Sequence, residues 1–291
     1  MSLPPHAPRL VADPAALEHL LEAVRGAPLV ALDTESNSFH AYRERVCLLQ
    51  LSTRDQDFIL DPLAVSPAPL GPILAEGREV VLHGADYDVR CLKREWGWSL
   101  PRIFDTMAAA RRLGRAGLGL TDLVASQFGA RLSKEFQRSD WGQRPLSDAQ
   151  LHYASLDTHF LLPIYDRLHS ELQERGLLDE ARKEFDKIAA VEPRPRVFDP
   201  EGWRRIKAAR ALEPASRAIL RALWVAREQR ASEVDRPPFK VLAEPTMVEI
   251  ARRRPRTPDE LARVPGVTAV LQRRLGGLIE AALRAAEQGG R

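Results

Sequence analysis

The stretch Leu29-Val-Ala-Leu-Asp-Thr-Glu35 decides the fold, because it is an apolar run that ends in two carboxylates. Its β-branched and apolar residues predict a buried strand at 29–33. Residues two apart in a strand point to the same face, so Asp33 and Glu35 are expected to project together. Such carboxylates repel each other unless a cation lies between them, and oxygen ligands suit Mg²⁺ or Mn²⁺. A surface charge pair is the common alternative for an isolated Asp-x-Glu, so the prediction depends on the acids that follow.

The sequence around this stretch alternates short strand patterns with helical patterns. Asp13 and Pro14 provide an N-cap and a first helical position, and the apolar spacing after them predicts a helix to about Gly26. Further strands are predicted at 46–52, 58–60, 80–83 and 103–104. Further helices are predicted at 70–76, 86–96, 106–113, 121–128 and 147–175. This order predicts an α/β fold in which helices flank a mixed β-sheet.

A second group of acids follows the strand predicted at 80–83, in the segment His83-Gly-Ala-Asp-Tyr-Asp88. Gly84 allows a tight turn, after which a carboxylate in the first turn of the next helix can face the end of the first strand. Asp86 stands where an N-cap is expected, whereas Asp88 lies one turn into the helix. We therefore predict that Asp88 is the metal ligand, and that His83 is either a packed residue or one that faces the substrate.

The third group lies on the helix predicted at 147–175, which begins with the capping box Ser147-Asp-Ala-Gln150. Tyr153 and Asp157 are four residues apart and are expected to share one helical face. A phenol in this position can orient a water molecule while the carboxylate helps to hold a metal ion. Tyr-x-x-x-Asp is common by chance, so its weight comes from its place after the other acids.

The C-terminal third differs from the rest of the chain in charge. Residues 201–291 hold 19 Lys and Arg against 11 Asp and Glu, a net charge of +8, whereas residues 1–200 hold 24 against 29, a net charge of −5. A basic domain predicts a polyanionic partner such as nucleic acid, and a solvated Arg-rich helical surface is an equal alternative.

The segment 191–200 contains three prolines and is the best linker candidate. Beyond it the sequence predicts only helices, at 199–201 onward, 215–232, 245–254, from the capping box Thr257-Pro-Asp-Glu260, and at 269–287. We predict a first domain at 1–192, a linker and connecting helix at 193–212, and a helical domain at 213–291.

Composition excludes several other classes of protein. Cys47 and Cys91 are the two cysteines, which excludes a disulfide framework or a Cys-rich zinc site and predicts reduced core thiols. No apolar stretch approaches the roughly 18 residues of a membrane span, and the first ten residues lack the apolar core of a signal peptide. We therefore expect a cytoplasmic protein with no membrane partner.

Taken in order, the acids resemble the three motifs of the DEDD superfamily of 3′→5′ exonucleases, in the subgroup with a tyrosine in the third motif. The matching residues are Asp33-x-Glu35, Tyr87-Asp88 and Tyr153-x-x-x-Asp157. The sequence over about 10–190 is similar to ribonuclease D, through residues 46–52, 104–106, 139–141 and 144–146. The C-terminal region resembles an HRDC domain, through residues 224–228, 235–238, 250–251, 255–261 and 265–267. Ribonuclease D chains can carry two such domains, whereas 213–291 has room for one.

The resemblance implies a ribonuclease H-like fold and two divalent ions, Mg²⁺ or Mn²⁺, among the four carboxylates. It implies that Asp33 bridges both ions, that Glu35 and Asp157 hold the ion of the attacking water, and that Asp88 supports the other. Tyr153 is then expected to orient that water. Asp105 is expected to support the site or to cap the following helix, and not to bind metal.

The resemblance also implies a substrate, the 3′ end of a single-stranded RNA such as a transfer RNA precursor or another stable RNA. The residues expected to hold it are His83, Lys134, Gln137, Arg138, Trp141 and Arg144. A loop packed around Trp141 is an equal alternative for the last five. A proofreading-like 3′→5′ DNA exonuclease would use the same acids, and a non-catalytic nucleic-acid-binding protein with a relic nuclease fold is the third possibility.

Overall fold

The computed structural model describes residues 7–193 and 197–288 and divides the chain into two compact units. The first unit comprises Met1–Asn37 and Arg45–Arg194, and the second comprises Ser38–Glu44 and Pro195–Arg291. The predicted linker falls partly on 194–196, which lie outside the described residues.

The first unit is built on a six-stranded sheet with the order β1-β4-β3-β2-β5-β6. The strands are β1 (Arg9–Val11), β2 (Leu29–Ser36), β3 (Val46–Ser52), β4 (Asp57–Leu60), β5 (Glu79–Leu82) and β6 (Ile103–Asp105). β2 is antiparallel to β3 and parallel to β5, and β3 is antiparallel to β4, which confirms the predicted mixed sheet. β1 was not predicted, because three residues are too few to establish an alternating pattern.

Eight helices of the described first unit flank this sheet. They are α1 (Pro14–Gly26), α2 (Leu70–Ala75), α3 (Asp86–Trp96), α4 (Thr106–Arg112), α5 (Leu120–Phe128), α6 (Asp148–His159), α7 (Leu161–Glu174) and α8 (Leu178–Ala189). The single helix predicted at 147–175 was wrong, because the chain breaks into α6 and α7 at Phe160. Pro163 in the first turn of α7 explains the break, since proline has no N–H to donate to the preceding turn.

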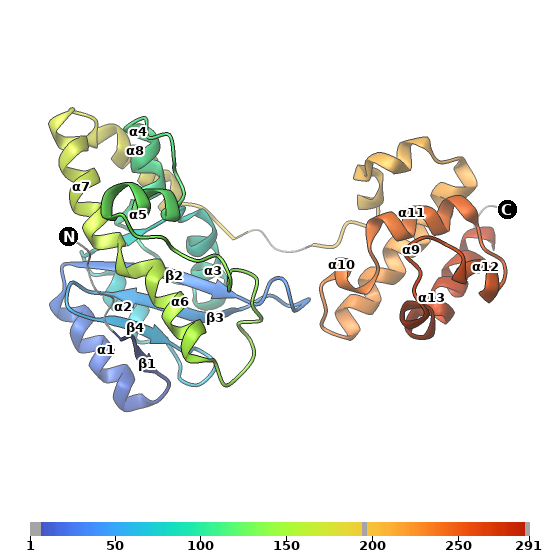
Figure 1. Ribbon diagram of the computed structural model, residues 1–291, viewed down its shortest axis with the longest axis horizontal. Coiled ribbons are helices and arrows are strands. Elements are labelled where there is room, and N and C mark those ends of the chain that lie inside the picture. The colour runs from blue at the N-terminus through green and yellow to red at the C-terminus, as the bar shows by residue number, and fades with distance from the viewer. Residues whose placement is uncertain (1–6, 194–196, 289–291) are drawn as a thin grey trace. The chain divides into compact units, whose positions relative to one another are not determined.

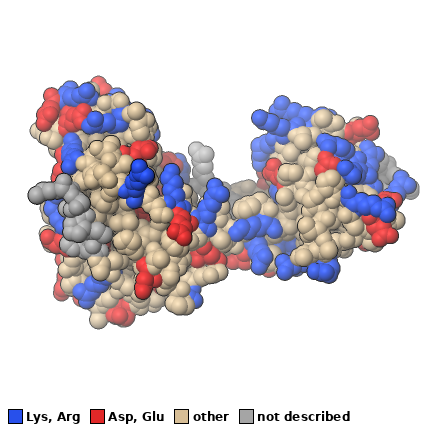
Figure 2. All heavy atoms as spheres, in the orientation of Figure 1, with Lys and Arg blue, Asp and Glu red and all other residues tan. Residues whose placement is uncertain are grey.

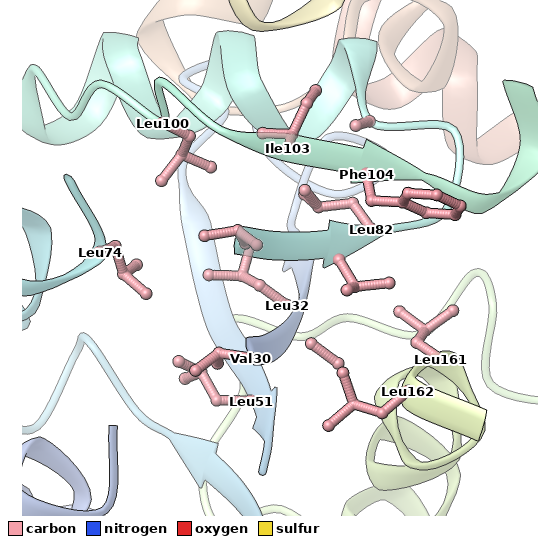
Figure 3. Packing of buried hydrophobic residues seen from close by; sticks show 14 of the residues in the cluster. Val30, Leu32, Leu51, Leu74, Leu82, Leu100, Ile103, Phe104, Leu161 and Leu162 are labelled. Atoms are coloured by element: carbon pink, nitrogen blue, oxygen red, sulfur yellow. The ribbon is translucent and has the colours of Figure 1, made fainter. Parts of the chain in front are cut away.

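The helices cover both faces of the sheet around a continuous apolar core. α6 packs across β2, β3 and β4, and α7 packs across β2 and β5 (Figure 1). Figure 3 shows Leu74 of α2 on one side of the sheet and Leu161 and Leu162 of α7 on the other. Burial on both faces explains why β3 is an uninterrupted run of buried residues, whereas β2 leaves its last carboxylates partly accessible.

The second unit is helical and has a core of its own. Its elements are the 3₁₀ helices η1 (Gly202–Arg205) and η2 (Lys207–Ala211) and the α-helices α9 (Pro214–Glu233), α10 (Pro238–Val241), α11 (Glu244–Arg253), α12 (Pro258–Ala262) and α13 (Ala269–Gln288). The α-helix predicted to open at 199–201 was wrong, because this stretch forms two 3₁₀ turns. The capping box predicted at Thr257 forms in part, since the Thr257 side chain accepts a hydrogen bond from Glu260 N at 3.1 Å, whereas the Glu260 carboxylate accepts from Arg256 N. None of the described helices is both long and apolar enough to cross a bilayer.

Candidate active site

Strand β2 places the first two acids of the site. Asp33 and Glu35 lie on the face of β2 that α6 covers, opposite Gln50 and Leu48 of β3. Thr34 between them points to the other face and donates a hydrogen bond to Asp88 Oδ1 at 2.5 Å. The strand therefore presents two carboxylates directly and holds a third through the intervening hydroxyl.

Helix α3 supplies that third acid. Asp88 is 5% exposed, whereas Asp86 is exposed and forms an ion pair with Arg90 one turn along the helix, with Nε to Oδ2 at 2.8 Å. The expectation that Asp86 is the N-cap was wrong, because Ala85 takes this position and makes no side-chain cap. The burial of Asp88 and its contact with Thr34 favour Asp88 over Asp86 as the acid of the site.

The two acids of α3 give a matched pair of variants. We expect Asp88→Asn to lower kcat by at least about a hundredfold if Asp88 binds metal as predicted, because loss of a metal ligand costs more than the 10- to 100-fold of an outer contact. Asp86→Asn removes a surface ion pair, and such pairs contribute little, so activity and stability should both remain close to wild type. Steady-state kinetics and thermal unfolding of the two variants check these expectations, and equal losses of kcat in both would contradict the assignment of Asp88.

Helix α6 supplies the fourth acid and the tyrosine. The predicted capping box is confirmed, since Ser147 and Gln150 bond reciprocally at the start of the helix. The ring of Tyr153 contacts two other aromatic rings. Its centroid lies 6.1 Å from that of Trp141 and 5.7 Å from that of Phe136. Because Asp157 follows Tyr153 by one turn, the same helix presents a fixed phenol and a carboxylate toward β2.

The four carboxylates lie in each other's electric field. Burial and the charges of Asp88, Asp157 and Glu35 raise the pKa of Asp33 well above its ordinary value. Burial and the charges of Asp157 and Asp88 raise the pKa of Glu35 to about 9. Burial raises the pKa of Asp88 and of Asp157 to about 7 each, and Asp88 adds to the effect on Asp157. Keeping four buried carboxylates ionised beside one another costs free energy, and a bound cation would offset this cost.

The donor set fits a hard divalent ion. All four groups are carboxylates, whose oxygens are the ligands that Mg²⁺ and Mn²⁺ prefer. Among the residues described here, no three His, Cys, Asp or Glu side chains are already gathered around a common metal position. The electrostatic cost and the chemistry of the donors therefore support a metal site, and the ligand set itself is a proposal.

The turn before α3 is fixed by a residue whose contacts the sequence did not reveal. Asp105 caps α4 by accepting hydrogen bonds from Met107 N at 2.8 Å and Ala108 N at 3.0 Å, which confirms the predicted cap. Its carboxylate also accepts from Gly84 N at 3.1 Å and from Ala85 N at 2.9 Å. Gly84 has a φ of 70°, which favours glycine, so the turn predicted there is confirmed. Asp105 thus anchors the start of the helix that carries the third acid.

His83 lies at the end of β5, beside this turn. Its Nδ1 lies 2.9 Å from the hydroxyl of Thr106, and that hydroxyl donates to Leu82 O at 2.9 Å. Nδ1 is therefore the protonated nitrogen, since the hydroxyl proton is already used. Burial lowers the pKa of His83, which favours the neutral ring, and its Nε2 is buried without a hydrogen-bond partner among the described residues.

The loop before α6 separates the other predicted substrate contacts into two kinds. Lys134, Gln137 and Arg138 are exposed at the surface of the loop. Trp141 is 1% exposed and packs under Tyr153, so its ring has no open face for a base. Arg144 forms a bidentate pair with Asp61, at 2.6 and 2.7 Å, and donates to Cys47 O and Trp141 O. These contacts favour structural roles for Trp141 and Arg144, as in the alternative of a packed loop.

A mixed sheet of this order, with four acids at the ends of β2, α3 and α6, defines a nuclease of the ribonuclease H-like fold. The chain belongs to the 3′-5′ exonuclease family, whose sequence profile matches residues 8–173, and the HRDC domain profile matches residues 216–283. Ribonuclease D from Gluconacetobacter diazotrophicus is 34% identical over 268 residues, which are 90% of this chain and 67% of that relative. The resemblance to ribonuclease D and to an HRDC domain is thereby confirmed.

Solved structures agree with this assignment. The catalytic core of RRP6 from Trypanosoma brucei superimposes with a TM-score of 0.90 at 27% identity, over 100% of this chain and 82% of that chain. Escherichia coli RNase D, described as an exoribonuclease involved in structured RNA processing, gives a TM-score of 0.73 at 31% identity, over 97% and 76% of the two chains. In curated relatives that are exosome complex component 10 homologues, the chain spans only about a third of the length, 31% and 28% in two of them.

Proposed function

We propose that this chain is a 3′→5′ exoribonuclease that removes nucleotides from single-stranded RNA ends with the help of two divalent ions. The observation that carries the proposal is the convergence of four carboxylates from β2, α3 and α6 in one electrostatically coupled site beside Tyr153. The similarity to ribonuclease D supports RNA as the substrate. Transfer RNA precursors and other stable RNAs as substrates, and a cytoplasmic location, remain predictions from the sequence.

In this mechanism the residues hold charge and orient water. Asp33, Glu35, Asp88 and Asp157 are the residues that would bind Mg²⁺ or Mn²⁺. The ions, when bound, stabilise the attacking and leaving oxygens of an in-line displacement at phosphorus. Burial and the neighbouring acids raise the pKa of Tyr153 above its ordinary value of 10, so its hydroxyl stays protonated at pH 7. Tyr153 therefore orients the attacking water through a hydrogen bond and does not act as a base.

Tyr153→Phe tests this role directly. We expect kcat to fall by about a hundredfold, because the positioned hydroxyl is lost while the aromatic packing against Trp141 and Phe136 is kept. The KM for RNA, the affinity for Mn²⁺ and the unfolding midpoint should stay close to wild type. Steady-state kinetics with Mn²⁺ titration measures these quantities, and a variant that retains wild-type kcat would exclude the proposed role of the hydroxyl.

The second unit supports RNA as a ligand through its surface charge. Lys and Arg side chains outnumber acids on the face of this unit that Figure 2 shows. One hollow of about 600 Å³ is lined by cations and by apolar side chains, among them Arg236, Lys240, Arg274, Val270 and Leu271. Cationic side chains in such a hollow can contact the phosphates of a single strand, and apolar side chains can contact its bases. We propose that this unit adds affinity for RNA without taking part in the chemistry.

A 5′-labelled single-stranded RNA and its DNA analogue, each incubated with Mg²⁺, Mn²⁺ or chelator, test the proposed function. A ladder of products that shortens from the 3′ end, that needs the metal and that forms faster on RNA supports it. Faster degradation of DNA would instead indicate a proofreading-like exonuclease. If the protein binds both the RNA and the DNA but degrades neither under any metal condition, it is a non-catalytic nucleic-acid-binding protein.

A further inference from the structure

One buried polar side chain at the site has no use in the proposed mechanism. Gln50 of β3 is 0% exposed, and both its amide atoms, Oε1 and Nε2, lack a hydrogen-bond partner among the residues that the structure describes. A buried amide without a hydrogen-bond partner destabilises the folded state, because it has lost its contacts with water. Folded proteins satisfy nearly all such groups, so one that is left open requires an explanation.

The register of the sheet puts this amide beside the first acid of the site. Gln50 pairs with Asp33 across the antiparallel β2–β3 ladder. Directly opposed residues of such a ladder have side chains on the same face, with Cβ atoms about 4.5–5.5 Å apart. Gln50 therefore lies on the same face as the carboxylate of Asp33 and is its immediate neighbour.

Helix α6 covers Gln50 from above. Leu48, two residues before Gln50, packs with Ala154 of α6 in one apolar cluster. Ser52, two residues after Gln50, has its Oγ 2.7 Å from Thr158 Oγ1 of the same helix. Gln50 thus lies beneath the turn of α6 between these two contacts, which is the turn that carries Asp157. The amide is buried from solvent there, and the carboxylate of Asp33 is the polar group that the ladder places directly beside it.

We infer that Gln50 is a positioning residue, whose amide Nε2 donates a hydrogen bond to the carboxylate of Asp33 when the site holds its metal ions. An ionised carboxylate is an acceptor only, and the side-chain amide is the uncharged donor closest to it along the ladder. A metal-binding carboxylate that accepts such a bond keeps one orientation, which raises the affinity for the ion. The inference rests on the proposed metal-dependent function.

The matched test compares Gln50→Met with Gln127→Met in the full chain. Methionine keeps the length and volume of glutamine and removes the amide. Gln127 of α5 also has a buried amide oxygen without a partner among the described residues, but α5 packs on α7 and carries none of the four acids. Mn²⁺ affinity is measured without RNA by electron paramagnetic resonance, and the unfolding midpoint is measured with chelator and with Mn²⁺.

We expect Gln50→Met to bind Mn²⁺ about 10- to 100-fold more weakly, in the range observed for outer contacts of metal ligands. Its midpoint in chelator should equal or exceed that of wild type, its gain in midpoint on adding Mn²⁺ should shrink, and kcat should fall with little change in KM. Gln127→Met should match wild type in Mn²⁺ affinity, in kcat and in the gain in midpoint from Mn²⁺. Wild-type Mn²⁺ affinity in Gln50→Met would overturn the inference, as would a lower midpoint in chelator combined with an unchanged gain from Mn²⁺. If the wild-type protein binds no Mn²⁺, the proposed function fails instead.

Discussion

Replacing Asp33 by asparagine is expected to lower the rate of RNA hydrolysis by about a thousandfold or more. The charge stabilisation that metal ions supply is worth several kcal/mol, and each 1.36 kcal/mol corresponds to a factor of ten in rate. Asp33 is the acid on which the charges of the other three act together, so its loss weakens the site as a whole. Asparagine keeps the shape of the side chain and removes its charge. Quenched-flow kinetics under single-turnover conditions measures the loss.

The same variant separates function from stability. Burial and three neighbouring acids disfavour ionised Asp33, so Asp33→Asn should unfold in chelator at the same temperature as wild type or at a higher one. Asp55→Asn in the exposed turn between β3 and β4 serves as the control, and it should retain full activity. Activity of Asp33→Asn within tenfold of wild type would sink the metal mechanism.

The metal-free protein is expected to lose stability as the pH rises from about 5 to about 9. The pKa of Glu35 is raised from 4.5 to about 9, and those of Asp88 and Asp157 are raised from 3.8 to about 7. Within this window the folded state binds more protons than the unfolded state, so the free energy of unfolding falls with rising pH. The stabilising protons are fully present below the unfolded pKa values and are lost as the pH passes the folded ones.

A loss on the order of 3 kcal/mol across this window would lower the unfolding midpoint by roughly 10 °C for a domain of this size. Differential scanning calorimetry in chelator measures the trend. Saturating Mn²⁺ should flatten it, because the ions replace the protons among the carboxylates. Glu35→Gln should flatten it in part even without metal. A midpoint that rises with pH in chelator would contradict the electrostatic coupling of the four acids.

Local sequence patterns predicted the elements on which the site is built. α1 and α3 have the predicted bounds: α1 has a clear N-cap at Asp13, and α3 has a strong apolar spacing although its expected N-cap was wrong. The strand that ends in Asp33 and Glu35 and the helix that carries Tyr153 and Asp157 follow from residue spacing alone, and the structure places these side chains in one electrostatic field. Periodicities of two and of 3.6 thus predicted which of these side chains share a face, and their assignment as metal ligands stays a prediction.

The supporting contacts could not be predicted, because they join residues far apart in the chain. The register of β3 against β2, which brings Gln50 beside Asp33, depends on the whole sheet. The bond from Thr34 to Asp88 spans 54 residues, and the bidentate pair of Asp61 with Arg144 spans 83. The burial of Trp141 is equally non-local, since α6 and the strands below it exclude the ring from solvent.

Asp105 has a consequence for anyone who redesigns this enzyme. One carboxylate serves two turns, because it closes the start of α4 and also accepts from the two amides that lead into α3. If the four acids are grafted onto another scaffold without Asp105, the carboxylates are transferred but the hydrogen bonds that fix the start of α3 are lost. An asparagine at this position would turn one of the two oxygens into a donor, facing backbone N–H groups that need an acceptor. Position 105 therefore belongs with the acids in any minimal transplant of the site.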